Sequence, residues 1–418
     1  MLNYLQLSSI ANNYEAKVYP VFMLAIVGEF LLRLKTVSYM RTSETIFNLI
    51  SGLLLILIRS LMLKLFSTCC QWLNTNYVLV NLTESTAQSS LIGYYSMIIC
   101  TFIMVDFLFY WCHRAGHEIN VFWATHQFHH SGEDYNLSVA SRTLATEANY
   151  VLLAFATVWL SVLIPGPTLI HVLEFIIVYQ FTLHTSLWKS YGWLDLVMIA
   201  PGDHSVHHGS NEYCLDRNYG SVLSVWDRWF GTYVRERPDE PVVYGLVHKP
   251  PVTYDFTRQS VYYFGLIYEK FSTNYPGQPT SLSNKWHSLF NKPSWSMPYI
   301  DNNNIDQVDM DDKIKQHNFE FNKLYNLNYR MHWYMYLYIT VHLLMISMDI
   351  FMVLNGRESM NIKLIMVKYL WTYLFLTSIG AILDNKTYAP IIELARLLIY
   401  YYYPMNNYYQ LSIEQIYN

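Results

Sequence analysis

Most of the histidines in this chain lie in four short stretches of an otherwise apolar sequence. They occur in HRAGH (113–117), HQFHH (126–130), FTLHTS around His184, and HSVHH (204–208). In a helix, residues i and i+4 share a face, with Cβ atoms ~6 Å apart, so the two imidazoles of HxxxH can hold one metal ion. Each HxxHH offers the same kind of face. We expect a metal centre built from His113, His117, His126, His129, His130, His184, His204, His207 and His208.

The number of imidazoles indicates two ions, because a structural zinc takes only about four ligands. The ligand type leaves the metal open, since imidazole suits Zn, Cu, Fe and Ni. A paired site beside a membrane is suited to activating O2 against an apolar substrate. A two-zinc hydrolase would use similar ligands, so this pattern alone leaves that alternative open.

The composition is typical of a membrane protein. Of 418 residues, 53% are hydrophobic and only 14% are charged, against roughly 25% charged in soluble domains. The net charge of −4 argues against nucleic-acid binding, which calls for basic stripes. The five scattered cysteines contain no C-x-x-C pair, so neither a disulfide framework nor a thiolate zinc site is indicated.

Long apolar runs predict the helices that position the histidines. A bilayer core of ~30 Å requires about 20 apolar residues, and the runs that qualify are 18–34, 46–66, 91–112, 332–354 and 362–383. The run 388–404 is shorter, and could span or lie in the interface. Segment 149–184, broken by Pro165, Gly166 and Pro167, predicts a helical hairpin. We predict an all-α, multi-span membrane bundle with a cytosolic, histidine-rich di-metal cap.

Flanking charges predict which side the histidines face. Arg33, Lys35 and Arg41 border the first loop, which the positive-inside rule places in the cytosol. A loop over 67–90 then lies on the far side, where the sequon NLT at Asn81 could be glycosylated. Alternation returns the third helix to the cytosol at Cys112. The whole histidine region should therefore face the cytosol.

We divide the chain into four parts on this pattern. Residues 1–90 carry N-terminal membrane helices, 91–250 the catalytic region with its hairpin, 251–331 a polar connecting region, and 332–404 the C-terminal membrane helices.

The histidine motifs resemble those of the fatty acid hydroxylase superfamily, membrane proteins with a dinuclear metal centre at the cytosolic face. The longer strings HRAGHE, HQFHHSGEDYNLSVASR, FTLHTSLW, HSVHHGSNEYCLDRNYGSVLSVWDRWFGTYVRE and VVYGLVHKP resemble its glyceryl-ether monooxygenase branch. That resemblance implies two iron ions, O2 and tetrahydrobiopterin. It also implies an endoplasmic reticulum membrane location and cleavage of the ether bond of an alkylglycerol to a fatty aldehyde and a glycerol derivative. Protein partners, chain-length preference and the pterin-binding residues stay open.

The resemblance also singles out residues besides the histidines. Glu118 matches a glutamate that the branch needs for activity, and from position alone it could orient a histidine, bind the pterin or be solvated. Asn211 and Asp216 could fix imidazole orientation through hydrogen bonds. Asp227 matches a recurring position of the family, and from position alone it could be a local cap or form an ion pair with Arg228. Asp203 stands where the branch usually has a further histidine, and could act as an acceptor there.

Two other functions remain as alternatives. Relatives in the superfamily hydroxylate or desaturate sterols or sphingolipids with electrons from cytochrome b5, and they share the core of the last motif. A metal transporter would place ionisable ligands inside its spans, whereas the histidines here fall at helix ends.

Overall fold

The computed structural model describes residues 18–33, 41–77, 91–247, 253–272, 282–294, 332–355 and 362–402. Over these ranges the regular structure is helical, apart from two isolated β-bridges, Met198 with Leu223 and Gly209 with Tyr244. Five of the described helices are long and apolar enough to cross a membrane: α2 (Thr42–Tyr77), α4 (Leu91–Glu118), α7 (Gly166–Leu183), α13 (Trp333–Asn355) and α14 (Ile362–Leu383). The predicted fold class, an all-α multi-span membrane bundle, is confirmed.

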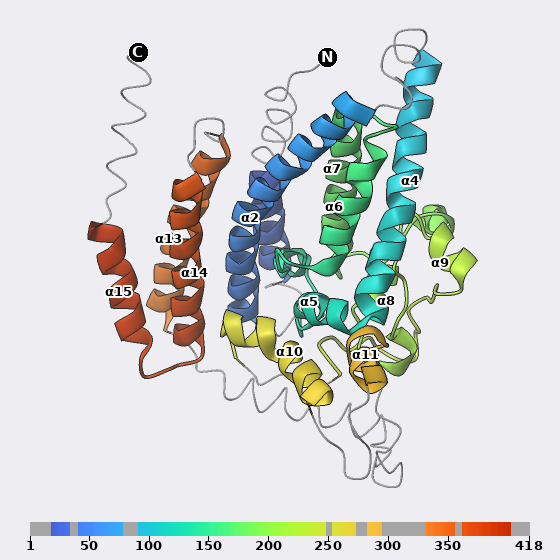
Figure 1. Cartoon of the computed structure of the whole chain (residues 1–418). Helices are drawn as coiled ribbons and strands as arrows, with labels where there is room; N and C mark the ends of the chain where they lie inside the picture. Colours follow the sequence, from blue (N-terminus) through green and yellow to red (C-terminus); the bar gives the residue numbers. More distant parts are fainter. Residues whose placement is uncertain are drawn as a thin grey trace, which may run out of the picture.

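Shorter helices gather at one end of the upright ones, as Figure 1 shows for α5, α8, α10 and α11. The shorter elements are a helix over residues 18–33, α5 (Asn120–His130), η1 (Leu137–Ser141), α6 (Ala148–Leu160), η2 (Gly192–Leu196), α8 (Pro201–His207), η3 (Glu212–Cys214), α9 (Val225–Phe230), α10 (Phe256–Ser272), α11 (Leu282–Phe290) and α15 (Ala389–Tyr402). At 14 residues, α15 is shorter than a bilayer crossing requires.

The loop predicted from residue 67 is wrong over its first part, because α2 continues as a helix to Tyr77. The extension is stabilised by packing: Phe66 and Cys70 are buried against Ile170 of α7. Near its end, Asn74 donates a hydrogen bond to Ser161 O at the turn of the hairpin. Because the second half of α2 contains residues such as Cys70 and Asn74, a search for apolar runs did not detect it. Asn81 and Lys35 lie outside the described residues.

The predicted hairpin is present as α6 and α7, which part at Pro165, the N-cap of α7. Its apolar side packs on α4 through a buried cluster that includes Val105, Leu153, Leu169 and Ile176. The hairpin thereby brings His184, just after α7, back to the end of α4 that carries HRAGH.

The N-terminal helix and the start of α2 are joined to the segment that follows HQFHH. Glu29 accepts hydrogen bonds from Leu137 N and from the Thr185 hydroxyl, both at 2.6 Å. Arg33 donates to Tyr135 O at 2.8 Å, and Arg41 forms an ion pair with Glu133. The first loop therefore begins and ends on the same side as the histidines, as the flanking charges predicted.

The C-terminal helices join the rest of the molecule mainly through α2. Phe47 and Ile50 of α2 share a buried core with Phe375 and Ile379 of α14. Just after α14, Asp384 accepts a hydrogen bond from Tyr254 N at 2.8 Å, next to the start of α10. In Figure 1, α13, α14 and α15 form a layer beside α2, away from α4.

Candidate metal centre

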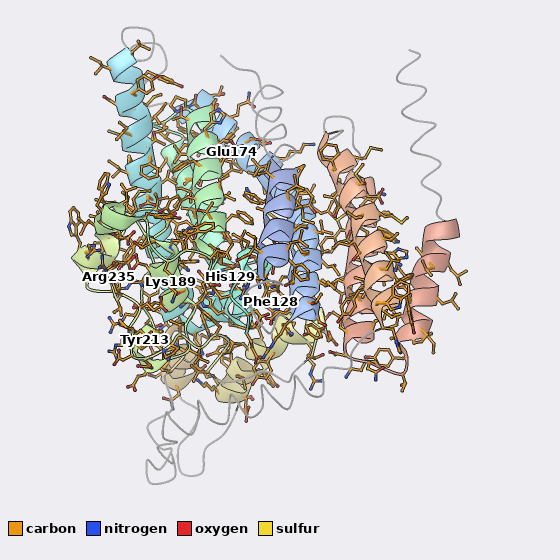
Figure 2. All side chains as sticks on the ribbon, turned by 180° about the vertical axis from the view of Figure 1, so that it is seen from behind. Phe128, His129, Glu174, Lys189, Tyr213 and Arg235 are labelled. Carbon is orange, nitrogen blue, oxygen red and sulfur yellow. The ribbon has the colours of Figure 1, made fainter. Side chains whose placement is uncertain are left out.

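The nine predicted histidines meet at one end of the bundle, and all nine are buried. They form two groups, in each of which the ligand atoms lie within 4.8 Å of one another. Group A contains His113, His117, His126, His130 and His207, and group B contains His129, His184, His204 and His208. Figure 2 shows His129 near this end, far along the molecule from Glu174 on α7.

Helix geometry explains how the motifs are shared between the groups. His113 and His117 lie one turn apart on α4 and both join group A. In each HxxHH the first and last histidines stay together, because i and i+4 share a face, while the middle one joins the other group. His126 and His130 of α5 enter group A and His129 enters group B; in HSVHH the assignment is reversed. Each HxxHH therefore contributes to both groups.

Several imidazoles are oriented through their outer nitrogen. His113 Nδ1 lies 2.9 Å from Tyr219 O, and His207 Nδ1 lies 2.9 Å from Arg217 O. In group B, His129 Nδ1 lies 3.1 Å from Arg142 O, and His184 Nδ1 lies 2.8 Å from Gln180 O. A carbonyl oxygen only accepts hydrogen bonds, so the proton sits on Nδ1 and the inner Nε2 presents a lone pair.

This tautomer leaves two lone pairs facing each other in group B. His129 Nε2 and His184 Nε2 are 3.3 Å apart, and neither carries the proton that a hydrogen bond between them would need. Group A has similar distances, with His126 Nε2 at 3.2 Å from His113 Nε2 and 3.1 Å from His130 Nε2. A bound cation would remove the repulsion in group B, and neutral imidazole nitrogens are the donors it would require.

Further buried nitrogens point to the same donor role. His117, His207 and His208 each have a buried Nε2 that lacks a hydrogen-bond partner within the described part of the chain. Buried polar atoms are nearly always satisfied, and an exception calls for an explanation such as an ion. Burial also lowers the pKa of His126 to about 3 and that of His184 to about 4. Both stay neutral at physiological pH, the form that binds metal.

Glu147, which the sequence analysis did not identify, is the carboxylate in contact with group A. Its Oε1 lies 2.6 Å from His126 Nδ1, and the side chain is buried. Burial raises the pKa of Glu147 and lowers that of His126, because it disfavours the charged form of each group. A carboxylate behind a ligating imidazole fixes its orientation and increases its basicity. Glu147 precedes α6 in an unremarkable stretch, ATEANY, with no motif spacing to reveal it.

Arg142 plays the corresponding part for group B through its backbone. Its carbonyl accepts a hydrogen bond from His129 Nδ1, and its buried guanidinium holds that carbonyl in place. The guanidinium donates to Phe128 O at 3.0 Å and to the Asn48 side chain of α2 at 3.0 Å. A further bond reaches the side chain of Gln259 on α10. Three helices therefore meet at the residue that orients His129.

Asp227 stabilises the turn at Tyr219, whose carbonyl accepts a hydrogen bond from His113 Nδ1. Its carboxylate accepts from Tyr219 N at 2.8 Å, from Gly220 N at 2.7 Å and from the Thr232 hydroxyl at 2.7 Å. It acts on His113 through the backbone of Tyr219, and does not pair with its neighbour Arg228, which donates to Asp195 O.

The other polar residues singled out from the sequence bond elsewhere. Asn211 donates to Glu240 and Pro241 O and accepts from Val243 N. Asp203 accepts from Ala200 N at the start of α8 and from the Tyr233 hydroxyl.

Glu118 lies at the edge of the centre and belongs to neither histidine group. It ends α4, one residue after His117, with its side chain 23% exposed. Its Oε1 lies 3.2 Å from Arg114 Nε and 3.4 Å from Lys292 Nζ, and Lys292 also pairs with Asp216. The four side chains form a partly exposed charged cluster beside group A.

The region that carries the nine histidines resembles known proteins. Residues 98–232 match the fatty acid hydroxylase family. The chain is 33% identical to the alkylglycerol monooxygenase of Xenopus tropicalis over 301 residues, 72% of this chain and 63% of that protein. It is 40% identical to the human alkylglycerol monooxygenase over 194 residues, 46% of this chain and 41% of that protein. A fatty acid hydroxylase of Lecanicillium sp is 27% identical over 159 residues, 34% of this chain and 42% of that protein.

The matched part of the chain spans less than two thirds of the length of these relatives. No solved structure matches the chain.

Proposed function

We propose that the chain oxidises ether lipids in a membrane, because it is an alkylglycerol monooxygenase homologue with a fatty acid hydroxylase region. The reaction inserts one oxygen atom of O2 at the carbon next to the ether oxygen of an alkylglycerol, with tetrahydrobiopterin as reductant. The resulting hemiacetal falls apart to a fatty aldehyde and a glycerol derivative. The endoplasmic reticulum, with the centre facing the cytosol, is the proposed location.

The observation that carries this proposal is the pair of buried histidine groups, one of five and one of four imidazoles. We propose that all nine are ligands to two iron ions, which would supply the activation of O2 when bound. The chain supplies orientation through the carbonyls of Tyr219, Arg142 and Gln180. Burial of every imidazole keeps bulk water from the centre.

The position of the centre suits a lipid substrate. The stripe of α4 that includes Ile92, Tyr95, Ile99 and Ile103 is apolar and exposed, as expected of a face in contact with acyl chains. The same helix carries His113 and His117 at its other end. A lipid in the adjacent leaflet could therefore present its ether linkage near the histidines while its alkyl chain stays in the bilayer.

We propose that Glu118 contributes to binding the pterin. A pterin offers several N–H donors, and a carboxylate that is partly exposed beside group A can accept them. In full-length protein, Glu118→Gln should raise the KM for tetrahydrobiopterin more than it lowers kcat, because the neutral amide is a weaker acceptor. An unchanged KM would remove Glu118 from pterin binding. Glu212→Gln, at an exposed position on η3, is the matched control.

Purified full-length protein tests the proposal as a whole. We expect elemental analysis to find iron, and an alkylglycerol assay to show loss of substrate only when tetrahydrobiopterin is added. Iron-free preparations that contain zinc and hydrolyse esters would support the two-zinc alternative instead. Activity on sterols or sphingolipids with a cytochrome b5 reducing system, and none with the pterin, would place the chain with the other relatives of the superfamily.

A further inference from the structure

An exposed apolar surface projects sideways from the histidine-bearing end of α4. Its members come from three elements, and their side chains face outward despite being large and apolar. We call this surface the aromatic platform, and it consists of Trp111 of α4, Trp193, Leu196 and Val197 in and after η2, and Trp229 and Phe230 of α9. Trp193 is 76% exposed and Trp229 is 72% exposed, whereas tryptophan is ordinarily highly buried on average.

Specific contacts hold the platform together. Arg228 Nη2 donates to Asp195 O at 3.0 Å, and Ser224 N donates to Val197 O at 2.9 Å, which joins α9 to η2. The ring of Phe230 packs on Trp111 at a centroid distance of 4.9 Å, and Trp226 packs on Phe107 at 5.0 Å. The platform is therefore a fixed part of the fold, attached to α4 through aromatic contacts.

The length of α4 sets the depth of the platform in the bilayer. Trp111 follows Leu91 by 111 − 91 = 20 residues, which is about 30 Å of helix and matches the hydrocarbon core. If the exposed apolar start of α4 lies at one boundary of the core, Trp111 and Phe230 lie at the other. Figure 1 shows α9 projecting beside α4, higher than α5 and α11.

The surroundings of the platform suit lipid head groups. The exposed apolar residues of α4 run from Ile92 to Met104, and Trp111, exposed again seven residues further along, lies on the same face of the helix as Met104. Arg228 of α9 and Arg235 are exposed, and both contact Tyr233. Lys189 is also exposed and pairs with Glu236, and Figure 2 shows Lys189 and Arg235 level with His129. Tryptophan beside basic residues is the usual composition of a protein surface at the membrane interface.

We propose that the aromatic platform lies in the interfacial layer of the leaflet next to the histidines and anchors that end of the molecule to lipid. The occupant is the bilayer itself, because the platform continues the lipid-facing stripe of α4. This inference concerns membrane seating and stands whether or not the proposed reaction is correct.

Site-specific photo-crosslinking in full-length protein tests the platform. Benzoylphenylalanine would replace Trp193 or Trp229, with the protein reconstituted in vesicles of phosphatidylcholine and phosphatidylserine. Mass spectrometry would then identify the adducts after irradiation. Ile99, on the exposed stripe of α4, serves as the lipid-contacting control. Trp286 of α11 is 61% exposed. Because α11 lies beyond the histidine-bearing end of α4 (Figure 1), Trp286 serves as the control outside the bilayer.

We expect lipid adducts at positions 193 and 229 to exceed those at 286 by at least about tenfold and to approach those at 99. The proposal would be overturned if lipid adducts form at position 99 while positions 193 and 229 give no more lipid adducts than position 286. Adducts at 193 and 229 to a second copy of the chain would do the same, and would make the platform a contact between protomers. Monodisperse protein with unchanged metal content shows that each replacement has left the fold intact.

Discussion

The two histidine groups are built from the same motifs but are supported differently. Group A is backed by a buried carboxylate, Glu147, as well as by backbone carbonyls. In group B, His129 and His184 are both oriented by carbonyl oxygens. A carboxylate behind an imidazole makes it a stronger donor than a carbonyl does. The two ions would therefore differ in ligand number and in electron supply, a difference suited to ions with unequal roles.

The largest effect is expected from removing one ligand of either group. His126 lies within 3.2 Å of two other group A nitrogens, and His129 lies 3.3 Å from His184 in group B. His126→Ala or His129→Ala should each reduce the metal content from two ions towards one per chain. Each should lower activity by more than about 100-fold, since even outer-sphere changes cost 10–100-fold. Elemental analysis and the alkylglycerol assay provide the measurements.

His171→Ala is the matched control, because His171 is exposed on α7 and pairs with Glu174 outside the centre. It should keep both ions. Full metal content in His126→Ala or His129→Ala would refute the assignment of that histidine as a ligand.

Arg142 should matter next, and mainly for group B. Arg142→Met removes a buried guanidinium whose partners on α2 and α10 would lose their donors. Breaking such a buried network costs about 3–5 kcal/mol. We expect a lower thermal unfolding temperature and loss of the group B ion before the group A ion. Arg258→Met, at an exposed position on α10, should change neither. Equal loss of both ions would show that Arg142 supports the whole fold rather than His129.

A substitution of Glu147 tests the same comparison at group A. Glu147→Gln keeps the shape of the side chain but withdraws the carboxylate from His126 Nδ1. Metal affinity of group A should fall by about 10–100-fold, while group B keeps its ion. Titration with a chelator, followed by metal content, would measure both. Preferential loss from group B would contradict the contact between Glu147 and His126 as the cause.

The sequence predicted that the nine histidines would gather at one place, because they repeat at helical spacing. HRAGH and HQFHH are local patterns, so the 3.6-residue period already places His113 with His117 and His126 with His130. It could not show that the middle histidine of each HxxHH belongs to the other group, which depends on how α5 and α8 face each other. Glu147 and Arg142 escaped notice because only folding brings them to His126 and His129.

The membrane helices show the same division. Apolar runs were sufficient for α4, α13 and α14, each of which exposes apolar side chains. They failed for the second half of α2, where Cys70 and Asn74 contact α7 and the hairpin turn. Packing against protein lets a helix carry polar residues that a hydropathy search treats as a loop.

The smallest predicted effect is a difference in stability between variants of two tyrosines that flank the histidine groups. The Tyr135 ring lies 5.4 Å from that of His208 in group B, and its hydroxyl donates to Leu183 O at 2.9 Å. The Tyr219 ring lies 5.3 Å from that of His117 in group A. Its buried hydroxyl has no partner among the residues that the structure describes.

Tyr135→Phe should therefore lower the free energy of unfolding by about 1 kcal/mol, the usual net value of such a hydrogen bond. Tyr219→Phe loses no bond and should leave stability unchanged, as measured by thermal unfolding of the two variants side by side. Equal destabilisation would mean that the Tyr219 hydroxyl is bonded in the folded protein. A loss of activity in Tyr219→Phe without loss of stability would place that hydroxyl next to a reactant, and only on the group A side of the centre.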